Sequence, residues 1–287
     1  MKKDAYQIIT DQILELMEKH GTDWNKPWKS TGSTQPSMPW SIGSGDNYKG
    51  INTLLLWSAG YTDQRFGTYK AWKDKGAQVR KGEKSTVITF WKMLETRNKE
   101  TGEKENFPML RTFNVFNAEQ CVNVPELVIP EPLPELERNA IADTFIANTG
   151  ADIRTESNRA YFVPSHDFIA LPEMGAFSDS DSYYGTLLHE LTHWTGHKDR
   201  LARTFGKSFG DNEYAKEELV AELGSVFLCV ELQVTAEPRA DHAKYLNSWI
   251  KGLKDDKKMI IQASSKASKA VEYLKELQET EQLQAVA

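Results

Sequence analysis

The sequence has only two cysteines, Cys121 and Cys229, among 287 residues, too few for the disulfide framework of a small secreted protein. No apolar run approaches the roughly 20 residues that span a bilayer, so no membrane partner is expected. The N-terminal segment is interrupted by acidic residues and has no small-residue cleavage site, which predicts no signal peptide. We therefore expect a cytoplasmic protein.

The composition is that of a soluble globular protein, with 39% hydrophobic and 26% charged residues, and the length suffices for one large or two ordinary domains. Charge is divided unequally along the chain. Residues 1–118 contain 18 Lys and Arg against 13 Asp and Glu, a net charge of +5, whereas the remainder contains 17 against 28, a net charge of −11. This division favours contact between the first half and a polyanion, although random scatter between two domains would give the same numbers.

Periodicity and turn residues predict an α+β protein. The first half reads as a helix over 4–19, a helix over 51–60, β-like runs over 85–93 and 110–116, and a hairpin loop over 95–108. The second half reads as mainly helical with a short sheet, including helices over 182–196 and 213–232 and one or two strands over 159–172. Four prolines between 125 and 134 predict an extended linker. The expected divisions are 1–122, a proline-rich linker over 123–136, and 137–287.

The segment HELTH, residues 189–193, matches the HExxH pattern and lies on a predicted helix. We expect this helix to end at Gly196 in a left-handed C-terminal cap. Positions i and i+4 share one helical face, so His189 and His193 can bind one ion. Glu190 lies about a quarter turn from His189, where a base can deprotonate a metal-bound water whose pKa falls to roughly 7. The pattern predicts a Zn²⁺ site with Glu190 catalytic; Mn²⁺ or Co²⁺ would also suit these ligands.

Three acids compete to be the third ligand. Glu218 and Glu222 are spaced i, i+4 beside an apolar stripe, where two carboxylates are costly unless a cation compensates. Their spacing is similar to that of thermolysin-like zincins, which assigns Glu218 to the metal and Glu222 to the support of a ligand histidine. Asp199 is the rival, since HELTHWTGHKD is similar to a minor metzincin pattern. Metzincins also need a methionine-bearing turn beneath the site, however, and the next methionine, Met259, lies far downstream in a helical pattern. A solvated acidic helix face is the remaining alternative.

A hydrolase would also need a donor for the developing oxyanion and a place for its substrate. The sequence does not choose among Tyr183, Tyr184, Tyr214 and His197 as that donor. The predicted strand within 159–172 is either the edge on which an extended peptide lies or a purely structural strand.

Aromatic and basic residues are interleaved in the first half, and six of the eight tryptophans lie at or before Trp91. Single-stranded nucleic acid is held by aromatic rings that stack on bases and by cations that follow the phosphates. The residues expected to bind it are Trp24, Trp28, Lys49, Tyr69, Lys70, Trp72, Lys73, Arg80, Lys81 and Lys84. The alternative is that many of these aromatics are core residues.

The stretches NKPW, YKGINTLLLW, YKAWKDKGAQVRKGEK and VFNAEQ resemble the N-terminal single-stranded-DNA-binding domain of ArdC-type antirestriction proteins. HELTHWTGH, EELVAELGSVFL and DHAKYLNSWIKGLKDDKK resemble the zincin-like metallopeptidase domain of the same family. The resemblance covers nearly the whole chain and implies His189 and His193 as metal ligands, Glu190 as the catalytic acid/base, and Glu218 as the third ligand. The N-terminal domain also occurs in plasmid primases, but no primase domain is evident here.

The family is associated with plasmids, phages and other mobile elements, and with protection of incoming single-stranded DNA from host restriction during conjugation. The resemblance implies a DNA-associated zinc metallopeptidase, with a host protein as the candidate substrate. Two alternatives remain at this stage: a protein that protects DNA by coating it, with a structural or vestigial metal, and a cytosolic metallopeptidase with no role on DNA.

Overall fold

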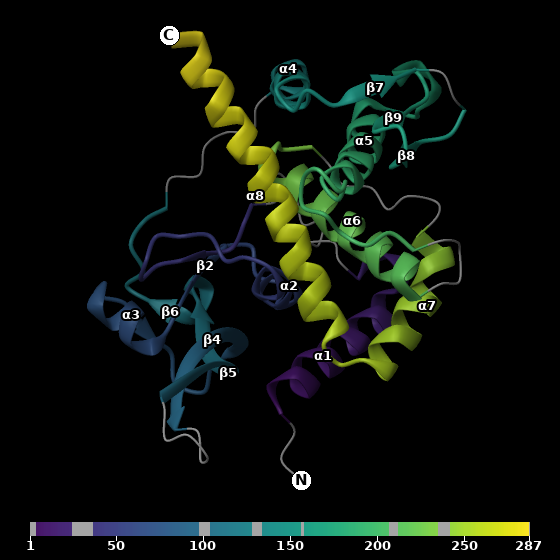
Figure 1. Ribbon diagram of the computed structural model, residues 1–287. Helices are drawn as coiled ribbons and strands as arrows, with labels where there is room; N and C mark the ends of the chain where they lie inside the picture. The colour runs from purple at the N-terminus through teal and green to yellow at the C-terminus, as the bar shows by residue number, and fades with distance from the viewer. Residues whose placement is uncertain are drawn as a thin grey trace.

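The computed structural model describes residues 4–24, 37–97, 104–127, 134–155, 158–206, 212–234 and 242–286 (Figure 1). The helices are α1 (Ala5–His20), α2 (Ile51–Ser58), α3 (Tyr69–Asp74), α4 (Glu135–Ala147), α5 (Ser180–Trp194), α6 (Asn212–Glu231), α7 (His242–Asp255) and α8 (Met259–Val286). The strands are β1 (Trp40–Ser41), β2 (Arg65–Gly67), β3 (Gln78–Val79), β4 (Thr86–Arg97), β5 (Lys104–Asn117), β6 (Cys121–Val122), β7 (Asp152–Arg154), β8 (Tyr161–Val163) and β9 (Phe168–Ala170). This is the predicted α+β class. Across the described ranges, no helix has the length and apolarity that a membrane crossing requires.

The first half contains a four-stranded sheet in the order β1-β2-β5-β4, and a separate pair of strands, β3 and β6. Strands β4 and β5 form a long antiparallel hairpin whose ladder continues to Arg97 and Lys104, within the segment that the sequence predicts as loop. Helix α2 contacts the outer edge of β4 through Asn52. The Asn52 side chain accepts a hydrogen bond from the Thr89 amide at 2.8 Å and donates one to the Thr89 carbonyl at 2.7 Å.

One hydrophobic core joins the two halves of the chain. Ile9 and Ile13 of α1 and Trp57 of α2 are buried in the same cluster as the apolar residues of α5, α6, α7 and α8. The Trp57 ring packs 5.9 Å from the ring of Phe227 on α6. Helices α1 and α2 therefore contribute to the core of the second half, while the β4–β5 hairpin extends away from α4 and α5 (Figure 1). The proline-rich linker falls partly on 128–133, outside the described residues, and its extended conformation stays a prediction.

Helices α5 and α6 pack closely because a glycine lies at their contact. A Cβ atom on Gly224 of α6 would meet the Thr192 Cγ2 atom of α5 at 2.5 Å. Thr192 is fully buried and its hydroxyl donates to the Leu188 carbonyl at 2.8 Å, so this side chain has little room to move. The prediction of a left-handed cap at Gly196 is wrong, because the φ angle of this residue is not positive. A glycine fits here for another reason: a Cβ atom would meet the Arg203 side chain at 2.8 Å.

Gly224→Ala should lower the free energy of unfolding by about 1–3 kcal/mol, because the new methyl group overpacks the α5–α6 contact. Gly185→Ala on α5 is the matched control: its Cβ would lie 3.9 Å from the Cys229 Sγ atom, an ordinary contact. Alanine in a helix interior is favoured over glycine by up to about 1 kcal/mol, so this control should be as stable as the wild type or more so. Urea denaturation followed by circular dichroism measures both; equal stability of the two variants would contradict the proposed steric role.

Candidate metal centre

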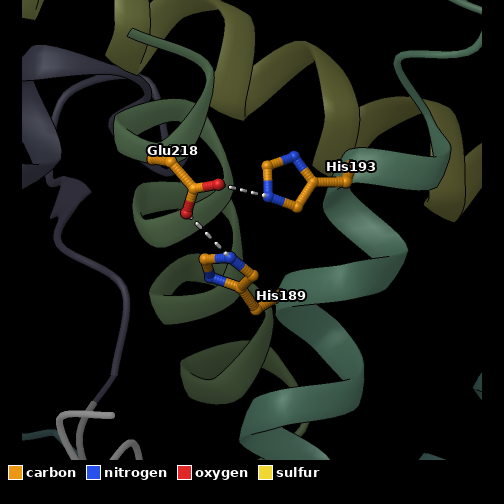
Figure 2. A group of neighbouring side chains, drawn as sticks. All are labelled: His189, His193 and Glu218. Carbon is orange, nitrogen blue, oxygen red and sulfur yellow. Dashed lines mark ion pairs between the residues drawn. The ribbon is translucent and has the colours of Figure 1, made fainter. Parts of the chain in front are cut away.

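Helix α5 places two imidazoles on one face. The Asp179 carboxylate begins the helix by accepting a hydrogen bond from the Ser182 amide at 2.7 Å. His189 and His193 are one turn apart on α5, and their ring centroids are 4.9 Å from each other. Both side chains point towards Glu218 of α6 (Figure 2).

Glu218 bridges the two histidines. Its Oε2 atom is 3.6 Å from the His189 Nε2 atom, and its Oε1 atom is 3.6 Å from the His193 Nε2 atom. The candidate ligand atoms of the three residues all lie within 4.8 Å of one another. In a tetrahedral site with bonds of about 2 Å, ligand atoms lie roughly 3.3 Å apart. The donor set therefore fits a divalent ion with only small adjustments.

Each imidazole directs its other nitrogen at a second glutamate of α6. The His189 Nδ1 atom lies 3.9 Å from Glu222 Oε2, and the His193 Nδ1 atom lies 3.3 Å from Glu217 Oε1. Glu222, the acid that the sequence predicts to support a ligand histidine, thus lies near the His189 ring but beyond hydrogen-bond distance of it, and its supporting role stays a prediction. Glu217 was not anticipated, although the sequence does place it directly before Glu218.

A buried arginine holds Glu217 in place. Arg203 donates to both carboxylate oxygens of Glu217, the shortest distance being 2.8 Å from Nη2 to Oε1. The same guanidinium donates to the Thr195 hydroxyl at 2.8 Å and to the Thr192 carbonyl at 2.6 Å, which fixes it to the end of α5. No short-range pattern links Arg203 to HELTH, so the sequence offered no signal for this contact.

The electrostatics of the site follow from these contacts. Burial opposes ionisation of Glu217, but the hydrogen bonds from His193 and Arg203 outweigh it and lower the pKa of this carboxyl. Burial likewise opposes a charged His193, but the carboxylates of Glu217 and Glu218 prevail and raise the pKa of its ring. Glu190, also buried, lies beside His189 on α5. Four carboxylates thus share one site, and burying so many acids together favours a cation among them.

A cavity of about 500 Å³ opens onto this cluster and is lined by both histidines and by Glu190 and Glu218. Tyr214, one turn before Glu218 on α6, also lines it, and its hydroxyl lies 3.2 Å from the hydroxyl of Tyr245. Burial, the hydrogen bond to Tyr245 and the nearby Glu218 charge raise the pKa of Tyr214 far above its ordinary value, which keeps its proton on the phenol.

One wall of the cavity is an edge strand. Within the described residues, the three-stranded sheet of the second half has the order β7-β9-β8, so β8 is an edge strand that pairs with β9. Tyr161 and Phe162 of β8 and the flanking Ala160 and Pro164 all line the cavity. Phe205 packs between this strand and the site, with its ring 5.9 Å from that of Phe162 and 6.4 Å from that of His193.

The rival residues lie elsewhere. The Asp199 side chain is 73% exposed and 3.5 Å from the His197 ring, and neither residue lines the cavity. Tyr184 is buried on α5 with its hydroxyl donating to Asp143 at 2.8 Å, and its neighbour Tyr183 does not line the cavity either. Among the candidates for an oxyanion donor, the structure brings only Tyr214 to the cluster.

Two of the residues expected to stack on nucleic-acid bases are core residues. Trp72 is fully buried, and its indole nitrogen donates to the Phe116 carbonyl at 2.9 Å. Trp24 is 6% exposed and packs edge-on against Trp249. Neither ring presents a face to solvent, which corrects that expectation. The sequence could not separate them from surface aromatics, because composition does not report burial. Trp28 lies outside the described residues.

Three of the expected cations are engaged in ion pairs, with Lys49 paired to Glu272 of α8 and Lys70 to Asp74 within α3. Arg80 pairs with Glu83. The remaining expected residues are exposed, and they are Tyr69, Lys73, Lys81 and Lys84.

Comparisons with known proteins agree with this geometry. Residues 3–116 match the family model described as the N-terminal domain of anti-restriction factor ArdC, and residues 140–266 match the one described as a zincin-like metallopeptidase. The protein y4eC of Sinorhizobium fredii (strain NBRC 101917 / NGR234) is 37% identical over 94% of this chain and 91% of its own length. A DNA primase TraC of Escherichia coli is 38% identical over the whole chain, which spans only 29% of that primase.

Two crystal structures of the antirestriction ArdC protein from the R388 plasmid are also similar, each 38% identical over 96% of this chain and 98% of that one. The TM-score is 0.81 for the metal-free structure and 0.79 for the Mn(II)-bound structure. The matches to y4eC and to the R388 ArdC protein extend over both halves of this chain and nearly the full length of those two relatives. The match to the zincin-like domain implies a divalent metal there. This chain belongs to the ArdC family of antirestriction proteins.

Proposed function

We propose that this protein protects single-stranded DNA of a mobile element from host restriction, and that it carries a metal-dependent peptidase site. The observation that carries the peptidase half is the convergence of two imidazoles and one carboxylate, within 4.8 Å of one another, at the floor of an open cavity. The DNA half is supported by the ArdC N-terminal match and by the basic charge of the first 118 residues. This chain spans 29% and 20% of the two relatives named DNA primase TraC, so the activity in that name is not carried over to it.

In this proposal His189, His193 and Glu218 hold the ion, and Glu222 and Glu217 orient the two rings. A divalent ion bound there, most simply Zn²⁺ with Mn²⁺ or Co²⁺ as alternatives, would polarise a carbonyl and lower the pKa of water. A set of three protein ligands is typical of catalytic zinc sites, whereas structural zinc sites usually have four.

The other catalytic roles fall to Glu190 and Tyr214. Glu190 lies beside His189 and lines the cavity, where a carboxylate can accept a proton from attacking water and return it to the leaving amine. Tyr214 keeps its proton at neutral pH and donates a hydrogen bond to the oxygen that gains negative charge.

The substrate proposed for this site is an extended polypeptide. The free edge of β8 borders the cavity, and an extended chain can add to such an edge through backbone hydrogen bonds. Its carbonyl would then be carried past the catalytic residues.

Glu190→Gln should abolish peptide hydrolysis and leave metal binding intact, because the amide cannot accept a proton but keeps the shape of the side chain. Loss should be at least about 100-fold, the lower range of general acid–base catalysis. The measurement is cleavage of unfolded casein by the metal-loaded protein. Glu213→Gln on α6, exposed and outside the cavity, is the control and should cut at the wild-type rate.

Cleavage by the Glu190 variant at the wild-type rate would reject the assignment. The same variant also separates the peptidase from the coating alternative: a single-strand protection assay with a restriction endonuclease should show full protection if coating alone suffices. The absence of any measurable affinity of the wild type for single strands would instead favour a peptidase that has no role on DNA.

Glu217→Gln should weaken metal affinity by roughly 10- to 100-fold, because the amide orients the His193 ring less strongly and leaves Arg203 without its counter-charge. Calorimetric titration with Zn²⁺ at fixed pH measures this, with Glu213→Gln again as the matched control. An unchanged affinity in a folded Glu217 variant would show that the Arg203–Glu217 pair does not act on the ion.

Tyr214→Phe should lower kcat by about 100- to 1000-fold with KM and metal affinity little changed, because a donor aimed at a developing oxyanion acts only in the transition state. Tyr245→Phe is the informative comparison, since it removes only the hydroxyl that contacts Tyr214. Steady-state kinetics on a fluorogenic peptide test the pair; a Tyr214 variant that raises KM alone would place this residue in substrate binding.

A further inference from the structure

The β4–β5 hairpin concentrates exposed apolar side chains. Of the large hydrophobic residues that are at least one-third exposed, five lie on these two strands, and they are Phe90, Trp91, Met93, Phe107 and Phe113. Single exposed apolar residues are ordinary, but a group of them on one element marks an interaction surface. The hairpin extends away from the helices that build the metal centre (Figure 1).

Three of these residues share one face of the hairpin. Phe90 is opposite Arg111 in the ladder, while Phe113 pairs with Ile88 and Phe107 with Leu94. Since side chains alternate along a strand, these rungs are separated by even numbers of residues and face the same side. The rings of Phe90 and Phe113 contact each other at a centroid distance of 4.2 Å. From Phe113 to Phe107 the face runs six residues, or about 20 Å.

The same face carries positive charge. Arg111 stands opposite Phe90, and Lys92 follows Phe90 by two positions on the same strand and is exposed. Lys84, also exposed, comes two residues before β4 begins. Single-stranded nucleic acid binds where aromatic rings stack on its bases and cations contact its phosphates, and this face offers both.

We propose that the Phe90–Phe107–Phe113 face of the β4–β5 hairpin, with Lys92 and Arg111, is the platform on which bases of single-stranded nucleic acid stack. This inference rests on the single-strand binding proposed above and gives it a location. The tryptophan of the basic segment YKAWKDKGAQVRKGEK is buried and cannot stack on a base. This segment instead contributes phosphate contacts through the exposed Lys73, Lys81 and Lys84. A duplex is excluded from the platform because its bases are already stacked inside the helix.

The test compares Phe90→Leu/Phe113→Leu with Phe90→Tyr/Phe113→Tyr in the full-length protein. Leucine keeps apolar bulk and removes the ring, whereas tyrosine keeps the ring. Fluorescence anisotropy with a labelled 20-nucleotide oligothymidine should show a loss of affinity of about 5- to 150-fold per stacked base for the leucine pair. The tyrosine pair should stay within about twofold of the wild type, because the stacking surface is preserved.

The cations are tested by salt dependence. Lys92→Gln/Arg111→Gln should reduce the slope of log K against log salt by about 1.4, since each phosphate contact on a single strand contributes about 0.7. The leucine pair should leave this slope unchanged. Thr112→Ala and Asn114→Ala, exposed positions on the opposite face of β5, are controls that should bind as the wild type does. Thermal unfolding verifies that every variant is folded.

The location is rejected if the wild type binds the oligonucleotide and the leucine pair binds it equally well; the proposed single-strand binding would then stand elsewhere on the protein. It is also rejected if light scattering shows a wild-type dimer that the leucine pair dissociates at unchanged DNA affinity, because the face would then join two copies of the chain. A wild type without affinity for single strands would instead remove the proposed DNA function together with its location.

Discussion

The packing of α5 against α6 is the constraint on which the metal centre depends. The imidazoles of His189 and His193 come from α5, and the proposed ligand Glu218 comes from α6 together with the two glutamates that lie behind the rings. Gly224 permits this close packing, because a Cβ atom there would meet the Thr192 Cγ2 atom at 2.5 Å. A pair of helices separated by an ordinary side chain would leave the donor atoms too far apart for bonds of about 2 Å to one ion.

The packing of α5 against α6 also gathers several carboxylates at the metal centre. A buried carboxylate is costly, and this site gathers three of them, Glu190, Glu217 and Glu222, around the partly buried Glu218. The buried Arg203 compensates Glu217 and ties it to the last turn of α5, so that the ring of His193 is held from behind while its Nε2 atom faces Glu218. The result is a site that is fixed by protein contacts on its helical side and open on the side of β8 and Tyr214.

The two halves of the protein are joined more closely than a linker alone would require. Ile13 of α1 and Trp57 of α2 complete the core of the zincin-like half, whereas the β4–β5 hairpin carries its exposed rings outward. A body built this way would hold the proposed nucleic-acid surface and the proposed peptidase cavity at fixed positions relative to each other. DNA binding would thereby concentrate the cavity near the transferred strand and the proteins that act on it.

The sequence by itself determined what depends on local spacing: the helices, the β4–β5 pair, and the common face of His189 and His193, because i, i+4 neighbours meet in any α-helix. It also sufficed for the family, through motifs on both sides of the prolines. Only the tertiary structure decided which acid lies 3.6 Å from both rings, that Arg203 holds Glu217, and that Trp72 is core while Phe113 is exposed. These outcomes depend on contacts between segments far apart in the chain, and periodicity carries no information about such contacts.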